Sequence, residues 1–159
     1  MSLDKRVVST PSSWQYTGLT SNTAYTVTIQ AFVTEKDGTI KFVGRKETLH
    51  CVTNNGGEKF TNPKSVKLSP SDKEIKLKKG KKQTVTVSVV GEKKGKKLYS
   101  YEGESLFTCF STNTKVANAV VNGNEVTIEA VGKGSCTIYF VASNGVYKTI
   151  KVKVTGKTK

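Results

Sequence analysis

Apolar and polar residues alternate along most of the chain, which is the pattern of half-buried β-strands. The strand-like runs cover residues 6–9, 26–33, 39–43, 45–52, 65–68, 74–77, 83–90, 106–110, 116–121, 126–130, 136–142 and 147–154. Turn-forming pairs such as Asn-Gly and Asp-Gly separate several of them. No segment has the spacing of a helix. The pattern therefore predicts an all-β chain.

The stretch Asn54 to Pro63 is rich in turn formers and divides a shorter first part from a longer second part. A chain of 159 residues has room for two small domains. We expect a first module with its linker at residues 1–60 and a second module at 61–159. Because the linker is short, we expect the two modules to lie end to end with limited swing.

The second part carries most of the charge. Residues 1–62 hold 7 basic and 5 acidic side chains, whereas residues 63–159 hold 19 and 7, and the whole chain has a net charge of +14. All basic residues of the second part are lysines, which lack the planar fork of arginine that grips phosphates and base edges. The charge fits either a solubilising coat or attraction to an anionic polymer.

The sequence contains no apolar run long enough to span a membrane. Its first residues, Met-Ser-Leu-Asp-Lys-Arg, lack the apolar stretch of a signal peptide. We expect the chain to be a piece of a longer protein.

The second part resembles the bacterial Ig-like domain, group 2. Three phrases carry the resemblance: Leu68-Ser-Pro70 followed by Ile75 to Gly80, then Ser111 to Ala117, then Gly132-Lys-Gly134 leading to Ile138. The resemblance covers almost all of residues 64–156 and implies a two-sheet β-sandwich.

The first part resembles the second half of a fibronectin type III domain. Leu19 precedes Tyr25, which opens a long strand, and this is the tyrosine-corner pattern, in which the hydroxyl bonds back to the upstream backbone. A whole domain of this kind has seven strands, and only about four are expected before Thr53. The resemblance implies an incomplete sandwich whose open face favours self-association.

Both resemblances imply a non-catalytic module of a bacterial cell-surface or secreted protein, extracellular or attached to the cell wall, that serves adhesion or acts as a spacer or accessory domain. Its partners would be proteins or polysaccharides at the cell surface. We expect no enzyme activity, no cofactor, no metal and no membrane span. The alternative function is electrostatic binding of an anionic cell-wall polymer or glycan, and nucleic-acid binding is disfavoured because arginines and reading motifs are lacking.

A lysine and tyrosine patch is the candidate site for such an anionic ligand. Two lysine-rich turns and the aromatic residues after the second turn would form it, if both turns lie at the same end of the sandwich. Its members are Lys78, Lys79, Lys81, Lys82, Lys93, Lys94, Lys96, Lys97, Tyr99 and Tyr101. Trp14 and Tyr16 could also stack on a sugar, but their position before the tyrosine corner favours core packing.

Cys109 and Cys136 are a candidate thiol pair, because both fall on inward positions of strands expected to be neighbours. A disulfide between neighbouring strands of one sheet strains its geometry. The pattern favours two free thiols that pack as small apolar groups, with Cys51 as the unpaired third.

Catalytic and metal-binding residues are scarce. His50 is the one histidine and is expected on a surface or sheet edge. Glu102 and Glu104 flank Gly103 in a loop and are expected to be solvated. Asn122 to Glu125 is interpreted as a hairpin turn rather than a calcium loop, and Gly132 to Gly134 as a turn rather than a phosphate loop.

Overall fold

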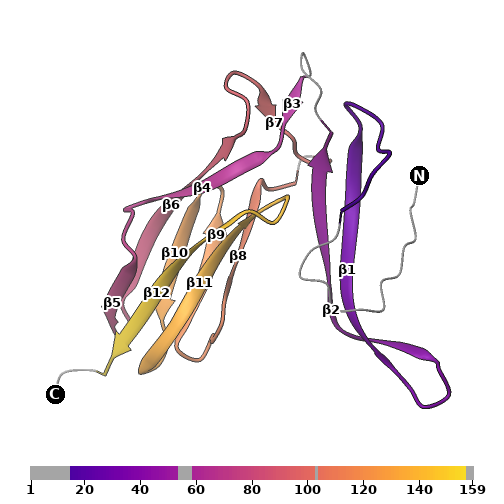
Figure 1. Cartoon of the computed structure of the whole chain (residues 1–159). Helices are drawn as coiled ribbons and strands as arrows, with labels where there is room; N and C mark the ends of the chain where they lie inside the picture. Colours follow the sequence, from indigo (N-terminus) through magenta and orange to yellow (C-terminus); the bar gives the residue numbers. More distant parts are fainter. Residues whose placement is uncertain (1–14, 54–58, 103, 157–159) are drawn as a thin grey trace.

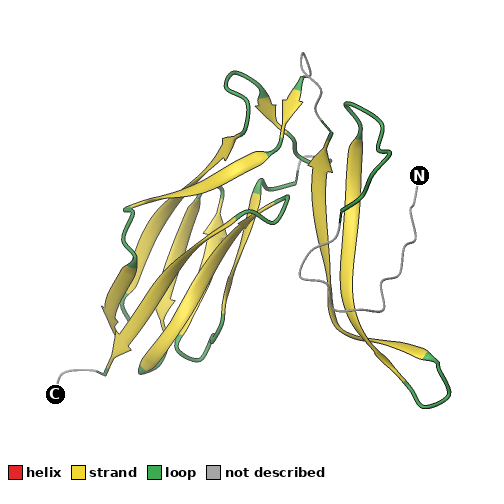
Figure 2. Cartoon of the chain, viewed as in Figure 1, coloured by secondary structure: helices red, strands yellow, loops and turns green. Residues whose placement is uncertain are grey.

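The computed structural model describes residues 15–53, 59–102 and 104–156 (Figure 1). Within these ranges the chain forms twelve β-strands and no helix (Figure 2). The strands are β1 (Ala24–Thr34), β2 (Ile40–Val52), β3 (Phe60–Thr61), β4 (Pro63–Ser69), β5 (Glu74–Lys78), β6 (Lys82–Gly91), β7 (Lys97–Leu98), β8 (Phe107–Ser111), β9 (Ala117–Asn122), β10 (Glu125–Ala130), β11 (Gly134–Ala142) and β12 (Tyr147–Thr155). The predicted all-β fold class is confirmed.

Two four-stranded sheets form a sandwich in the second part of the chain. One sheet has the order β4-β6-β10-β9 and the other has the order β5-β12-β11-β8. Neighbouring strands are antiparallel except for β5, which runs parallel to β12. The predicted interruption of the first strand is confirmed, and its two halves, β4 and β5, belong to opposite sheets.

Alternation along the strands places one side chain in two inside the sandwich. Along β11 the buried positions are Cys136, Ile138, Phe140 and Ala142, separated by partly exposed residues. Valine, isoleucine and phenylalanine side chains from both sheets make a single core. Burial of this apolar surface is the main stabilisation of the sandwich.

The motif Ser111 to Ala117 makes the crossing from one sheet to the other. The Asn113 carbonyl accepts hydrogen bonds from the N–H groups of Val116 and Ala117, at 3.0 and 3.2 Å. The Asn113 side chain accepts a third from the N–H of Lys115, at 3.1 Å. Asparagine suits this place because its short amide can close a local turn.

The tight turn after β9 is confirmed as a two-residue hairpin connection, because Asn122 pairs with Glu125. The predicted turn around Gly132 is also confirmed, and it joins β10 of one sheet to β11 of the other.

The first part of the chain is a long two-stranded hairpin of β1 and β2, which lies beside the sandwich (Figure 1). The runs 39–43 and 45–52, expected with Gly44 as one arm of a hairpin, both belong to β2. Gly44 adopts a positive φ of 72°, and the register shifts at this irregularity without ending the strand. The expected strand at 6–9 lies outside the described residues.

Tyr25 makes the predicted tyrosine corner. Its hydroxyl accepts a hydrogen bond from the N–H of Thr20, with a distance of 2.9 Å. The hairpin tip is closed by Asp37, whose carboxylate accepts the N–H of Thr39 at 2.9 Å. This hydrogen bond lowers the pKa of Asp37.

Large apolar side chains are exposed on the hairpin. Ile29, Val33 and Phe42 are 56%, 45% and 53% exposed. The expected self-association would use these residues and stays a prediction.

Candidate functional site

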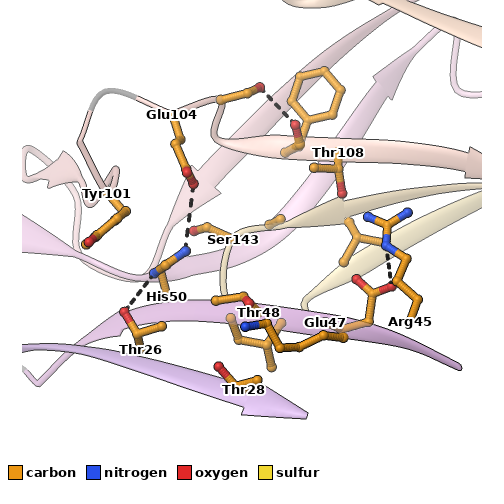
Figure 3. A pocket seen from close by; sticks show the side chains of 16 residues that line it. Thr26, Thr28, Arg45, Glu47, Thr48, His50, Tyr101, Glu104, Thr108 and Ser143 are labelled. Atoms are coloured by element: carbon orange, nitrogen blue, oxygen red, sulfur yellow. Dashed lines mark hydrogen bonds and ion pairs between the residues drawn. The ribbon is translucent and has the colours of Figure 1, made fainter. Parts of the chain in front are cut away.

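A cleft of about 530 Å³ lies between the hairpin and the sandwich. Threonines of β1 and residues 45–50 of β2 form one wall (Figure 3). The other wall comes from the sandwich side and consists of Tyr101, Glu104, Ser105, Phe107, Thr108, Val141, Ala142 and Ser143. The lining mixes polar and apolar side chains and carries both signs of charge.

His50 lies in this cleft and contacts three segments. Its ring stacks on Tyr101 with centroids 4.5 Å apart and planes 5° apart. Its Nδ1 lies 3.1 Å from the hydroxyl of Thr26, and its Nε2 lies 3.7 Å from a carboxylate oxygen of Glu104. His50 lies on an edge strand, as expected, because the sheet of β1 and β2 has two strands. Its side chain is only 12% exposed, so it is not a solvated surface histidine. The loop that carries Tyr101 and Glu104 folds over it.

Glu104 therefore has a specific partner, although it was expected to be solvated. The pair attracts when His50 is protonated, but Glu104 itself stays 61% exposed, which weakens the attraction through solvent screening. Gly103, between the two glutamates, lies outside the described residues. A hydrogen bond to the Glu102 carboxylate, together with the charge of that group, raises the pKa of Tyr101.

Thr26, His50 and Glu104 occur in the order of a nucleophile, a base and an orienting carboxylate. A working triad needs a hydrogen bond between base and carboxylate to fix the imidazole tautomer. The 3.7 Å between His50 and Glu104 exceeds hydrogen-bond distance. The ring is instead held by stacking on Tyr101. This geometry fits a structural contact better than nucleophilic catalysis.

The edge of β2 next to the sandwich is capped by hydrogen bonds. The N–H of His50 donates to the Ser143 carbonyl at 2.8 Å. The amide of Asn62 accepts the N–H of Val52 at 2.8 Å and donates to its carbonyl at 2.6 Å. Asn62 therefore pairs with Val52 as a neighbouring strand would. Leu49 also lies at this joint. Its side chain is so near Gly145 that a Cβ added there would be in van der Waals contact with it, at 3.5 Å.

Ser143 also brings an unsatisfied group to the cleft. Among the residues with described positions, its hydroxyl is the buried side-chain oxygen without a hydrogen-bond partner. It belongs to the cleft lining (Figure 3), where a water molecule or a ligand hydroxyl could satisfy it.

The predicted lysine patch is not a single patch. Lys78, Lys79, Lys81 and Lys82 lie in and around the turn from β5 to β6, and the lysines from 93 to 97 lie beyond the other end of β6. Ten residues of extended strand separate the two groups by about 30 Å. Lys82 is moreover paired with Glu129 of β10. The condition that both turns share one end of the sandwich is not met.

The two tyrosines of the predicted patch have structural partners. Tyr99 packs edge-on against Phe60, with centroids 5.7 Å apart, beside the two-residue parallel pairing of β3 with β7. Tyr101 stacks on His50. Tyr101 is exposed, as expected, whereas Tyr99 is half-buried. Both rings have contacts that help to attach the first part of the chain to the sandwich. Tyr16 is half-buried, and Trp14 lies outside the described residues.

Cys109 and Cys136 lie on adjacent strands of one sheet, but the register separates them. Cys109 faces Phe140 across the β8-β11 pair, four residues further along β11 than Cys136. All three cysteines are free.

Thiol reactivity should follow burial. Burial raises the pKa of Cys51 and of Cys109, so less reactive thiolate is present at a given pH than in an exposed cysteine. Iodoacetamide should therefore label both more slowly in the folded protein than in urea, and faster as the pH rises. Mass spectrometry of labelled peptides would measure the rates. Equal rates for Cys51 in folded and unfolded protein would contradict the burial described.

No group of three or more His, Cys, Asp or Glu side chains in the described ranges is arranged to hold a metal ion. None of the segments that the structure describes is a helix able to cross a membrane.

No protein-family model matches the chain, and no curated protein matches it. Several solved structures are similar. Domains 1–6 of the surface layer protein SbsC align with a TM-score of 0.48 and 17% identity, over 91% of this chain and 22% of that one. Domains 4 and 5 of the S-layer protein SbsC align with a TM-score of 0.46 and 18% identity, over 87% and 74%. At this level of similarity the function has to be argued from the residues of the chain itself.

Proposed function

We propose that the chain is a non-catalytic module of an exported bacterial surface or secreted protein, in which it acts as a spacer or accessory unit that holds its neighbours in a fixed relation. The proposal rests on the joint between hairpin and sandwich, formed by Leu49, His50, Val52, Asn62 and Ser143. The resemblance of residues 64–156 to a bacterial Ig-like domain supports an extracellular or wall-attached location.

The joint suits a spacer because it resists rotation. Three segments of the sandwich side contact the end of β2, at Leu49, His50 and Val52, through backbone hydrogen bonds at His50 and Val52 and ring stacking on Tyr101. Units connected only by a flexible linker would move independently. Here the contacts fix the orientation of the hairpin relative to the sandwich.

Several polar groups of the cleft are engaged in this joint or with each other, whereas the Ser143 hydroxyl has no partner among the described residues. His50 contacts Thr26, Tyr101 and Glu104, while Arg45 lies 3.1 Å from Glu47. A catalytic site would need its base and nucleophile free to meet a substrate. Attachment to anionic polymer through the two lysine turns loses its basis, since the turns lie at opposite ends of β6.

Asn62→Ala should loosen the joint. The substitution leaves the N–H and carbonyl of Val52 without partners, although Val52 is 4% exposed, and such a loss costs about 1–3 kcal/mol. Faster amide hydrogen exchange is expected at His50 and Val52, and ¹⁵N relaxation should show the hairpin tumbling more independently.

Asn118→Ala on exposed β9 is the matched control and should change neither measurement. Unaltered exchange and relaxation in Asn62→Ala would reject the joint as the element that fixes the hairpin, and with it the spacer proposal.

A further inference from the structure

Three aromatic side chains form a row on the outer face of the β5-β12-β11-β8 sheet. Phe110 of β8 stacks on Tyr139 of β11, with centroids 5.0 Å apart and planes 3° apart. Tyr139 in turn contacts Tyr147 of β12, with centroids 5.7 Å apart and a tilt of 41°. Phe110 is 51% and Tyr147 62% exposed. This aromatic ridge crosses three strands and stands in solvent.

Lysines lie on the same face, on β12 and β5. Lys151 and Lys153 follow Tyr147 along β12. Lys151 is four residues further along the strand, which corresponds to about 13 Å. On neighbouring β5, Lys76 lies beside Lys153 in the register, and Lys78 is exposed further along. Glu74, 3.9 Å from Lys76, is the one carboxylate among the outward residues described on these four strands. The face therefore joins exposed rings to an excess of positive charge.

The outer face of the other sheet has neither property. Its strands β4, β6, β9 and β10 contain no aromatic residue. Thr84 and Thr127 contact each other across it at 3.4 Å between hydroxyls, and Lys82 is paired with Glu129. If these residues served only to solubilise the protein or to stabilise the sheets, aromatic and lysine residues would be expected on both outer faces. The asymmetry indicates that the aromatic and lysine face has a ligand.

The aromatic ridge lies next to the cleft. Thr108 and Val141 lie two residues along the strands from Phe110 and Tyr139, respectively, and both line the cleft. Across the strand pair, Val141 faces Tyr147. A chain-like ligand that crosses the ridge would thus reach Lys46 on the cleft wall.

We infer that this face binds an acidic polysaccharide built of pyranose rings. The apolar C–H faces of the sugars would lie against the exposed rings of Tyr147 and Phe110, and the lysines would attract the carboxylates. A nucleic acid fits less well because the face has no arginine fork for phosphates. A second copy of the chain fits less well because two such lysine faces would repel each other.

Polygalacturonate is the acidic probe, with neutral galactan and duplex DNA as comparisons. The full chain should migrate more slowly in native affinity gels that contain polygalacturonate, and calorimetry should show binding at physiological salt. Galactan should bind weakly because it lacks carboxylates. Added salt should weaken but not abolish binding to polygalacturonate, since salt screens charges and not ring contacts.

Matched variants on the two faces test the site itself. Tyr147→Ala and Lys153→Glu should each weaken polygalacturonate binding by about tenfold or more. Lys67→Glu makes the same charge change at an exposed position of β4, on the other sheet. Val120→Ala shortens a side chain of β9 that is 47% exposed. Both controls should leave affinity within about twofold. All four positions are exposed, and circular dichroism would verify that the variants fold.

Other outcomes would overturn the inference. Equal losses in Lys153→Glu and Lys67→Glu, with DNA bound as tightly as polygalacturonate, would show attraction to any polyanion. Self-association that Tyr147→Ala abolishes would show that a second copy covers the face. Absence of polygalacturonate binding at low salt would exclude this ligand class. None of these outcomes affects the joint, which is tested separately by Asn62→Ala.

Discussion

Phe140→Ala should lower the free energy of unfolding of the sandwich by about 3–5 kcal/mol. Phe140 is 0% exposed and lies on β11, between β8 and β12. Its ring belongs to the single core that the two sheets share. Removal of the ring therefore leaves a cavity that the surrounding strands cannot close. Natural domains have only about 5–15 kcal/mol of stability. A large part of the stability would therefore be lost, and urea denaturation followed by circular dichroism would measure it.

Phe110→Ala is the control for this prediction, because the same residue type is replaced on the adjacent strand. Phe110 points outward, is 51% exposed and makes a single ring stack with Tyr139. Loss of such a ring pair costs about 0.5–1.5 kcal/mol. If both variants lost the same stability, Phe140 would not be the centre of the core.

The sandwich could be predicted from the sequence because one physical rule covers nearly all of it. A strand in either sheet of a sandwich buries every second side chain against the other sheet, and β10 and β11 show this as strict alternation. The glycine and asparagine turns then mark where strands end. The same rule predicts the core residues, including Phe140, but it says nothing about which polar residues meet across the finished fold.

The bulge near Gly44 shows what a local pattern misses. Residues 39–52 were expected as one hairpin arm, but the sequence does not reveal that the positive φ of Gly44 is absorbed within the paired strand as a bulge. The separation of the lysine turns, in contrast, could have been found. The run 83–90 was predicted as one strand, and the two ends of one strand cannot share an end of a sandwich.

The sites themselves depend on contacts between distant segments. His50 meets Tyr101 and Glu104 only because the loop before β8 folds over the hairpin. The aromatic ridge needs the register that places Phe110 opposite Tyr139. The available signal was that all three ridge aromatics occupy outward positions of their strands, where solvent would favour polar residues.

Gly132→Ala should destabilise the sandwich by about 1–3 kcal/mol. A Cβ at this position would lie 2.6 Å from the carbonyl oxygen of Lys115, and this oxygen belongs to the backbone rather than to a mobile side-chain end. The turn cannot simply move away, because the N–H groups of Val131 and Gly132 donate to the Val116 carbonyl at 2.9 and 3.1 Å. The clash therefore has to be relieved by breaking these hydrogen bonds or shifting β9.

Gly156→Ala is the matched control, since a Cβ there meets nothing within 4 Å and the backbone needs no positive φ. Its stability should stay within about 0.5 kcal/mol of the parent, as measured by the urea midpoint. Amide chemical shifts of Lys115 and Val116 should move in Gly132→Ala alone. Similar stability in the two variants would show that the approach of Lys115 is not tight.

If the prediction holds, the phrases Ser111 to Ala117 and Gly132 to Gly134 are two sides of one contact, because a Cβ at Gly134 would also lie 2.8 Å from Val116. Their spacing in the sequence then reflects the packing of one turn against the other.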